Sequence, residues 1–146
     1  MIREAKIEDI PAILKTVHES IRSCVQDHNR NESEIQIWLE EINQSDLMLL
    51  MLYNDSWVYV EENIIAGFLL INDHGKILLN YIAPEMQQQG IGTAMLLNIC
   101  ERFKVKNISH ITLETTHTAL PFYQKQGFEI TPNENTTVIN MVKSLA

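Results

Sequence analysis

Residues 87–92 read Gln-Gln-Gln-Gly-Ile-Gly and lie between an apolar run, residues 77–82, and a helical pattern over residues 93–103. A strand that leads through a glycine-bearing loop into a helix start forms an anion site, because unpaired main-chain N–H groups and the helix dipole converge there. Gly90 and Gly92 have no Cβ, so a phosphate can approach those N–H groups closely. This feature therefore predicts a loop that binds phosphate or pyrophosphate.

Two familiar phosphate motifs do not fit these residues. A Walker loop requires Lys and then Ser or Thr after its second glycine, whereas Thr93 and Ala94 follow Gly92. A dinucleotide fingerprint requires a third glycine near Met95 and an acidic residue about twenty positions on, and the two do not occur together here. An ordinary tight turn before a core helix is the alternative that the loop alone leaves open.

A second segment, residues 119–128, reads Ala-Leu-Pro-Phe-Tyr-Gln-Lys-Gln-Gly-Phe and predicts a short helix that ends at the glycine. Together the two segments resemble the GNAT N-acetyltransferase superfamily, whose motifs are Gln/Arg-x-x-Gly-x-Gly and Ala-x-x-(Phe/Leu)-Tyr-x-(Lys/Arg)-x-Gly-Phe. The first motif matches Gln87, Gly90 and Gly92, and the second matches Ala119, Phe122, Tyr123, Lys125, Gly127 and Phe128. The resemblance extends over most of the chain.

The resemblance implies that acetyl-coenzyme A (acetyl-CoA) is the cosubstrate, and it implies no metal. Main-chain amides of the loop would hold the pyrophosphate. The strand before the loop would carry a bulge and splay from its neighbour, so that the pantetheine arm of the cosubstrate enters the gap. The residues expected to contact acetyl-CoA are Tyr81, Ile82, Gln87, Gln88, Gln89, Gly90, Ile91, Gly92, Thr93, Thr116 and Phe122.

The resemblance also implies a catalytic role for Tyr123, whose hydroxyl would act as the general acid beside the sulfur. A packed aromatic ring whose hydroxyl bonds a neighbour is the alternative. A main-chain N–H near Ile82 would stabilise the developing oxyanion. Thr116 departs from the family pattern, since many relatives have an asparagine that contacts the cosubstrate at this position.

The sequence offers no obvious general base. Many relatives carry a carboxylate on the strand before the phosphate loop, whereas residues 77–82 read Ile-Leu-Leu-Asn-Tyr-Ile. Asn80 is a neutral amide that can hold substrate or a water molecule but cannot take a proton. A water relay, or an amine that arrives neutral, would remove the need for a base. The titratable candidates, each of which could instead be a solvated surface group, are His28, Glu62, His74 and His117.

The acceptor side of the cleft is expected in the first half of the chain. Residues 1–73 carry five Lys and Arg against fourteen Asp and Glu, whereas residues 74–146 carry six against five. An acidic wall would attract a cationic amine and repel nucleic acid, although most of these carboxylates could also form solvated helix faces. Glu34 is a further candidate acid on this side of the cleft. Trp38 could contact the acceptor, and packing in the core is the alternative for its side chain. The residues expected to contact the acceptor are Asp27, His28, Trp38 and Asn80.

Hydrophobic periodicity predicts the remaining elements. Strands are expected at residues 2–5, 56–61, 64–72, 77–82, 108–115, 128–131 and 137–142, and helices at residues 10–21, 35–42 and 93–103, besides the short helix that Gly127 ends. Glu62 and Asn63 would form a hairpin turn. The order β-α-α-β-β-β-α-β-α-β-β predicts an α/β (α+β) fold with a single mixed, mostly antiparallel central sheet flanked by helices, as in the acyl-CoA N-acyltransferases.

Length and composition limit the class of protein. At 146 residues the chain is expected to form one domain, residues 1–146, with a core large enough to fold unaided. The longest apolar run, residues 47–53, is too short to span a membrane, and the charged N-terminus does not resemble a signal peptide. A cytoplasmic protein is therefore expected. Cys24 and Cys100 fall in apolar helical surroundings and are expected to be buried free thiols.

The resemblance, together with these observations, predicts an N-acetyltransferase that moves an acetyl group from acetyl-CoA to a primary amine of a small molecule or peptide, by direct attack in a ternary complex. It would act as a monomer or homodimer, without nucleic acid or a membrane as partner. A degenerate relative that binds acyl-CoA without turnover, as a sensor or interaction module, is the alternative. The missing strand carboxylate favours that alternative, and the retained Tyr123 opposes it.

Overall fold

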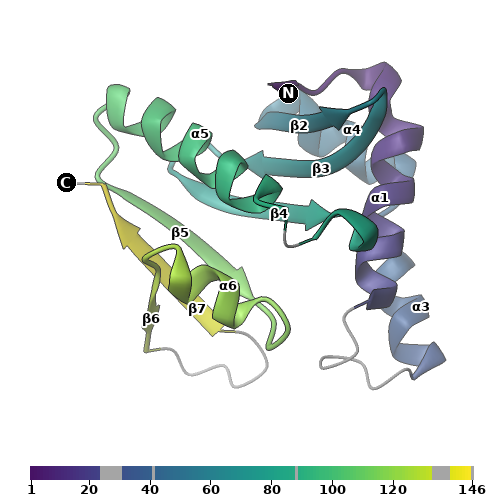
Figure 1. Cartoon of the computed structure of the whole chain (residues 1–146). Coiled ribbons are helices and arrows are strands. Elements are labelled where there is room, and N and C mark those ends of the chain that lie inside the picture. The colour runs from purple at the N-terminus through teal and green to yellow at the C-terminus, as the bar shows by residue number, and fades with distance from the viewer. Residues whose placement is uncertain (24–30, 41, 88, 133–138, 146) are drawn as a thin grey trace.

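The computed structural model describes residues 1–23, 31–40, 42–87, 89–132 and 139–145. Within these residues the chain forms a seven-stranded sheet in the order β1-β2-β3-β4-β5-β7-β6, flanked by helices (Figure 1). Neighbouring strands pair antiparallel, except β4 and β5, which are parallel. The mixed, mostly antiparallel sheet confirms the expected fold class.

The elements follow the predicted order with one addition, the helix α4. The strands are β1 (Ile2–Glu4), β2 (Asp55–Glu61), β3 (Ile64–Ile71), β4 (Lys76–Ile82), β5 (His110–Thr115), β6 (Glu129–Thr131) and β7 (Ile139–Ser144). The helices are α1 (Ile10–Ser23), α3 (Glu32–Glu40), α4 (Gln44–Tyr53), α5 (Ile91–Val105) and α6 (Leu120–Lys125), with 3-10 turns η1 (Ile7–Asp9) and η2 (Pro84–Met86). None of the helices in the described residues is long and apolar enough to cross a bilayer.

The helix α4 is missing from the predicted order because its apolar side chains show no helical period. Asn43 caps the helix, and its side-chain oxygen accepts a hydrogen bond from the Asp46 N–H at 2.9 Å. Leu47 is fully buried, whereas Leu49 and Leu52 are exposed. Apolar residues therefore lie on several sides of α4, and a sequence of this kind gives no amphipathic stripe to detect.

The β2–β3 hairpin forms at the predicted turn. Glu61 and Ile64 are paired, so Glu62 and Asn63 make a two-residue connection. Both turn residues have positive φ, 49° for Glu62 and 65° for Asn63. A turn with two left-handed residues matches the twist of the flanking strands, and asparagine adopts this conformation more easily than most residues.

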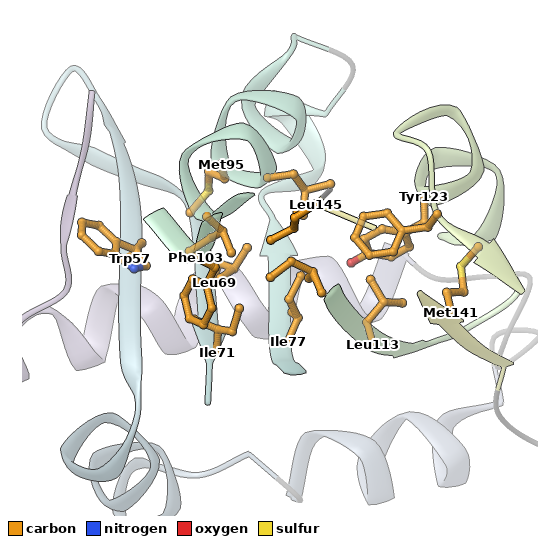
Figure 2. Packing of buried hydrophobic residues seen from close by; sticks show 14 of the residues in the cluster. Trp57, Leu69, Ile71, Ile77, Met95, Phe103, Leu113, Tyr123, Met141 and Leu145 are labelled. Carbon is orange, nitrogen blue, oxygen red and sulfur yellow. The ribbon is translucent and has the colours of Figure 1, made fainter. Parts of the chain in front are cut away.

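Two apolar cores lie on opposite faces of the sheet, because alternate residues of a strand point to opposite faces. On β3, Leu69 and Ile71 belong to the first core, and Phe68 and Leu70 to the second. The first, which we call the α5-face core, is shown in Figure 2 and includes buried residues of β2, β3, β4, α5, β5, α6 and β7. The second, the α1-face core, is formed by the stripe Ile10, Ile13, Val17 and Ile21 of α1 with residues of α4, β2 and β3.

The sheet opens between β4 and β5. In the described residues these strands pair only at Lys76 with Thr112 and at Ile77 with Leu113, and further along they diverge (Figure 1). A register shift lies at the same point: β3 pairs Ile71 with Ile77 but Leu70 with Leu79, which leaves Leu78 as the extra residue of a bulge. The bulge and the splay that the resemblance implied are both confirmed.

Candidate active site

A cavity of about 820 Å³ lies at the opening between β4 and β5. Its lining comes from α1, α3, β4, the glycine loop, α5, β5 and α6, so the gap in the sheet forms its centre. A volume of this size is typical of a small-molecule site. The cavity is therefore the candidate active site.

The β4 strand turns the main chain of alternate residues toward the gap. Ala83 N–H donates to the Ala66 C=O of β3 at 2.8 Å, and alternate residues of a strand direct these groups to opposite sides. The main-chain groups of Asn80 and Ile82 therefore point away from β3, into the opening, while those of Tyr81 face β3. Gln87 Nε2 donates to the Ile82 C=O at 3.1 Å, which links the glycine loop to the end of the strand.

Gly90 starts helix α5 in a left-handed conformation, with φ at 82°. The first helical hydrogen bond runs from the Ala94 N–H to the Gly90 C=O at 3.0 Å, so the N–H groups of residues 91–93 precede the helical ladder. A Cβ built on Gly90 would meet no atom within 4 Å. The loop therefore combines open space with main-chain donors at the positive end of a helix dipole, as an anion site requires.

Gly92 has a different role from Gly90. A Cβ at Gly92 would lie 2.9 Å from Phe122 Cζ, so this glycine allows the α6 ring to pack against the first turn of α5. The same two helices are joined by a hydrogen bond from Gln126 Nε2 to Thr93 Oγ1 at 3.0 Å. The missing side chain at residue 92 thus allows α5 and α6 to pack closely beside the loop. The sequence pattern alone did not predict this role of the glycine.

Tyr123 extends from α6 into the α5-face core, as Figure 2 shows. Its ring makes edge contacts with Phe122 and Phe128, at centroid distances of 5.2 Å and 5.6 Å. Its hydroxyl oxygen accepts a hydrogen bond from Asn80 Nδ2 at 2.8 Å. Burial raises the pKa of Tyr123 to about 12, against a smaller lowering effect of the Asn80 hydrogen bond. The phenol is therefore fully protonated near neutral pH.

The cavity brings most of the predicted site residues together. Gln89 is an exception, because it is exposed and its Nε2 donates to the Glu85 C=O at 3.3 Å. The Ile91 side chain is another, since it is buried in the α5-face core and only its N–H remains for a ligand. The predictions for Asp27, His28, Gln88 and Cys24 lie outside the described residues. The predicted residues that line the cavity are Trp38, Asn80, Tyr81, Ile82, Gln87, Gly90, Gly92, Thr93, Thr116, Phe122 and Tyr123.

An acidic acceptor wall is not present in the described part of the cavity. Glu114 is the carboxylate that lines it there, and this side chain pairs with Lys76 Nζ at 3.2 Å. Glu34 is exposed on α3 and does not line the cavity. The charge excess of the first half of the chain therefore lies mainly on solvated surfaces. The remaining candidate bases in the described residues are exposed in turns and do not line the cavity: Glu62, His74 and His117.

Several lining residues were not identified from the sequence. Ser20 and Ser23 of α1 face the cavity, and Ser20 is buried beside the apolar stripe of that helix. A signal was present, because Thr16, Ser20 and Ser23 recur at helical spacing and Thr16 Oγ1 donates to the Ile65 C=O at 2.8 Å. Polar residues on the buried side of an amphipathic helix would have indicated this wall. Met86, Thr118 and Gln126 were also missed near the loop and α6, whereas Ala119 and Lys125 were identified as motif residues but not as site residues.

Known proteins resemble this chain over most of its length. The sequence model of the family described as "Acetyltransferase (GNAT) domain" matches residues 24–144. The peptidyl-lysine N-acetyltransferase YiaC of Escherichia coli (strain K12) is 30% identical over 134 residues, which cover 89% of this chain and 84% of that protein.

Solved structures share the fold at lower sequence identity. The PaiA N-acetyltransferase from Thermoplasma acidophilum, in complex with coenzyme A, superposes with a TM-score of 0.87 at 21% identity, covering 99% of this chain and 98% of that one. A GNAT-type N-acetyltransferase structure from Rhodopseudomonas palustris gives a TM-score of 0.86 at 15% identity, with 99% and 94% covered.

Proposed function

The chain belongs to the GNAT acetyltransferase family, as an acetyl-CoA-dependent N-acetyltransferase, and from this premise we propose that it acetylates a primary amine by direct attack in a ternary complex. One observation carries the proposal: the opening between β4 and β5 has the glycine loop at one side and the Tyr123 hydroxyl at another, within one cavity. A single ligand can therefore extend from the loop to the phenol.

The residues of the cavity fit acetyl-CoA as a substrate. Open space at Gly90 and the N–H groups of residues 91–93 suit its diphosphate, which is a strong hydrogen-bond acceptor. The main-chain groups of Asn80 and Ile82 suit the amides of the pantetheine arm, because an extended chain can add to an open strand edge. This arrangement would place the thioester near β4 and α6.

The reaction forms a C–N bond between the amine and the acetyl carbonyl and breaks the C–S bond of the thioester. Placing the amine against the carbonyl supplies a large share of the acceleration, on the order of 7–11 kcal/mol for well-oriented reactants. The Ile82 N–H points into the opening and would stabilise negative charge on the carbonyl oxygen. The proton that the amine nitrogen loses ends on the thiol or on solvent.

Tyr123 acts in this scheme mainly by donating a hydrogen bond to the departing sulfur. Its pKa of about 12 is far above the value of roughly 8.5 for a thiol, so complete proton transfer from the phenol to a thiolate is uphill. A hydrogen bond to the developing thiolate has no such cost, and one preorganised donor of this kind accounts for about 100-fold to 1000-fold in rate. Tyr123 is therefore proposed as a hydrogen-bond donor to the departing sulfur, and not as a general acid that transfers its proton completely.

A lysine-type amine is the acceptor class that we propose. The named activity of YiaC, on peptidyl-lysine, supports this choice, and the acceptor end of the cavity supplies an aromatic ring, Trp38, and the hydroxyls of Ser20 and Ser23. An alkyl chain can lie along an aromatic ring while its nitrogen reaches the thioester. Among the described lining residues there is no histidine, and the one carboxylate, Glu114, is paired with Lys76. The amine would therefore arrive neutral or lose its proton through water.

The test is thiol release from acetyl-CoA across a panel of lysine peptides, peptide N-termini, polyamines, free amino acids and aminoglycosides. Lysine peptides should react best, and their kcat/KM should rise with pH toward the amine pKa of roughly 10.4. Mass spectrometry should place the acetyl group on the side-chain nitrogen. Stabilisation by coenzyme A without turnover on any amine would instead support the sensor function.

A further inference from the structure

The hydrogen bond between Asn80 and Tyr123 joins the two sides of the opening. Asn80 lies on β4 and Tyr123 on α6, 43 residues apart in sequence, and Nδ2 donates to the phenol oxygen at 2.8 Å. Both residues line the cavity. The bond therefore lies where the cosubstrate sulfur is expected.

The Asn80 amide is only half used by the protein. Its Oδ1 is buried and has no hydrogen-bond partner among the described residues, although most buried polar atoms in folded proteins have one. The opposite orientation of the amide would let the phenol donate to Oδ1, and would occupy the phenol hydrogen. The observed orientation leaves that hydrogen for another acceptor.

We infer that Asn80 is a positioning residue for acetyl transfer: by donating to the Tyr123 oxygen, it leaves the phenol hydrogen directed into the opening, toward the departing sulfur. This inference rests on the proposed role of Tyr123. A phenol oxygen that accepts from an amide can still donate its own hydrogen, whereas a phenol that donates to a neighbouring oxygen cannot donate strongly to a second acceptor. Asn80 thus determines which way the hydroxyl bond points.

Asn80→Asp separates this role from a merely structural one. The aspartate has nearly the same shape, but its ionised carboxylate only accepts hydrogen bonds, so at a pH where it is ionised the phenol must donate to it. A structural bond between β4 and α6 would survive the change. A positioning role would be lost, and kcat should fall about as far as in Tyr123→Phe, by about 100-fold to 1000-fold, with KM for acetyl-CoA nearly unchanged.

Asn72→Asp is the matched control for the added charge. Asn72 lies in the β3–β4 turn, where its side-chain oxygen accepts from the His74 and Lys76 N–H groups at 2.9 Å and 3.0 Å. Aspartate keeps both of these bonds, so this variant should retain the wild-type kcat. Asn80→Ala is a second variant, which frees the hydroxyl to rotate and should give a smaller loss than Asn80→Asp.

A spectroscopic readout reports the direction of the bond without turnover. The Raman Fermi doublet of tyrosine has a high intensity ratio when the phenol oxygen accepts a hydrogen bond, and a low ratio when the phenol donates to a strong acceptor. Subtracting the spectrum of Tyr123→Phe isolates the Tyr123 signal. Wild type should show the acceptor pattern, and Asn80→Asp the donor pattern.

The double variant Tyr123→Phe with Asn80→Asp completes the test. If Asn80 acts through Tyr123, the double variant should be no slower than Tyr123→Phe alone. Additive losses would overturn the inference and leave the proposed function standing. An unchanged rate in Tyr123→Phe would overturn the proposed role of the tyrosine, and the positioning role with it.

Discussion

The two apolar cores differ in how far they extend across the sheet. The α5-face core reaches from Trp57 on β2 to Met141 on β7 and therefore crosses the opening between β4 and β5 (Figure 2). The α1-face core includes no described residue beyond Tyr81 of β4. On the α5 face of the sheet the apolar core thus continues across the opening. On the α1 face, apolar packing ends at β4, at the edge of the opening.

This difference explains why the site lies at the opening. In the described residues, parallel pairing of β4 and β5 is limited to Lys76 with Thr112 and Ile77 with Leu113, so the α5-face core carries much of the cohesion between the two parts of the sheet. Because the α1-face core stops at β4, the cavity can extend from Trp38 and Ser20 on that side to Tyr123 on the other. A ligand can enter the sheet without disrupting a continuous core.

The largest effect is expected from removing the Tyr123 hydroxyl, a change that separates the catalytic role of this residue from its packing in the α5-face core. Tyr123→Phe keeps the ring contacts and should lower kcat about 100-fold to 1000-fold, because the donor to the sulfur is lost. Steady-state kinetics with acetyl-CoA and the best amine measure this. Tyr59→Phe, which removes a hydroxyl on β2 outside the cavity, should leave kcat unchanged.

The pH dependence of the wild-type rate is a second test of the role of Tyr123. The phenol must be protonated to donate, and its pKa is raised to about 12, so this form is lost only as pH rises through that value. Between about pH 6 and pH 10, the rate should therefore show no fall that depends on Tyr123. A descending limb in this range that disappears in Tyr123→Phe would contradict the assignment.

Leucine truncations test whether the two cores differ in function as the comparison predicts. Leu113→Ala in the α5-face core and Leu47→Ala in the α1-face core each remove a buried side chain, so each should lower the free energy of unfolding by roughly 2–5 kcal/mol. Urea unfolding measures both. Only Leu113 lines the cavity, so only its variant should also weaken acetyl-CoA binding by calorimetry. Equal weakening by both variants would show that the two cores do not differ in their contact with the site.

The α5-face half of the site was predictable from sequence because it depends on local backbone conformation. Gly90 must adopt a positive φ, and the motif around Tyr123 must end a short helix at a glycine, so few residue types fit these positions. Such requirements leave a pattern within a few consecutive residues. The strand, loop and helix that form the cradle were therefore all identified.

The acceptor half was harder to predict because its residues are assembled by tertiary packing. The acidic composition of the first half suggested a charged wall, but net charge says little about which side chains face a cavity. The Asn80 bond to Tyr123 joins residues 43 positions apart, and no local pattern reports such a contact. Helix α4 was missed for the related reason that its apolar residues lack a period.

The two glycines mark the border between the α5-face core and the site, and alanine at each should have different effects. Gly90→Ala adds a methyl group to open space, so acetyl-CoA binding should weaken about tenfold if the diphosphate occupies that space. Because residue 90 has a positive φ, alanine at this position should also cost about 1–2 kcal/mol of stability. Gly92→Ala would meet the Phe122 ring at 2.9 Å and should disturb helix packing more than binding. Calorimetry and thermal melting separate these outcomes, and a Gly90→Ala protein with unchanged affinity would remove the diphosphate from this loop.

The smallest effect is expected at the start of the α1 side, far from the opening. Arg3 Nη1 lies 2.8 Å from Asp9 Oδ2, and the Arg3 hydrogen bond lowers the pKa of Asp9 despite partial burial. Because the folded pKa lies below the unfolded value of roughly 3.9, the stabilisation is present above that pH and is lost as pH falls through the folded pKa. Asp9→Asn should therefore lower the free energy of unfolding by up to about 1 kcal/mol at neutral pH, with the difference from wild type disappearing in acid. Glu8→Gln, at the more exposed Lys6 pair, is the control and should change nothing measurable. If the loss of stability in Asp9→Asn persisted unchanged in acid, shape and hydrogen bonding, and not charge, would stabilise the turn that precedes α1.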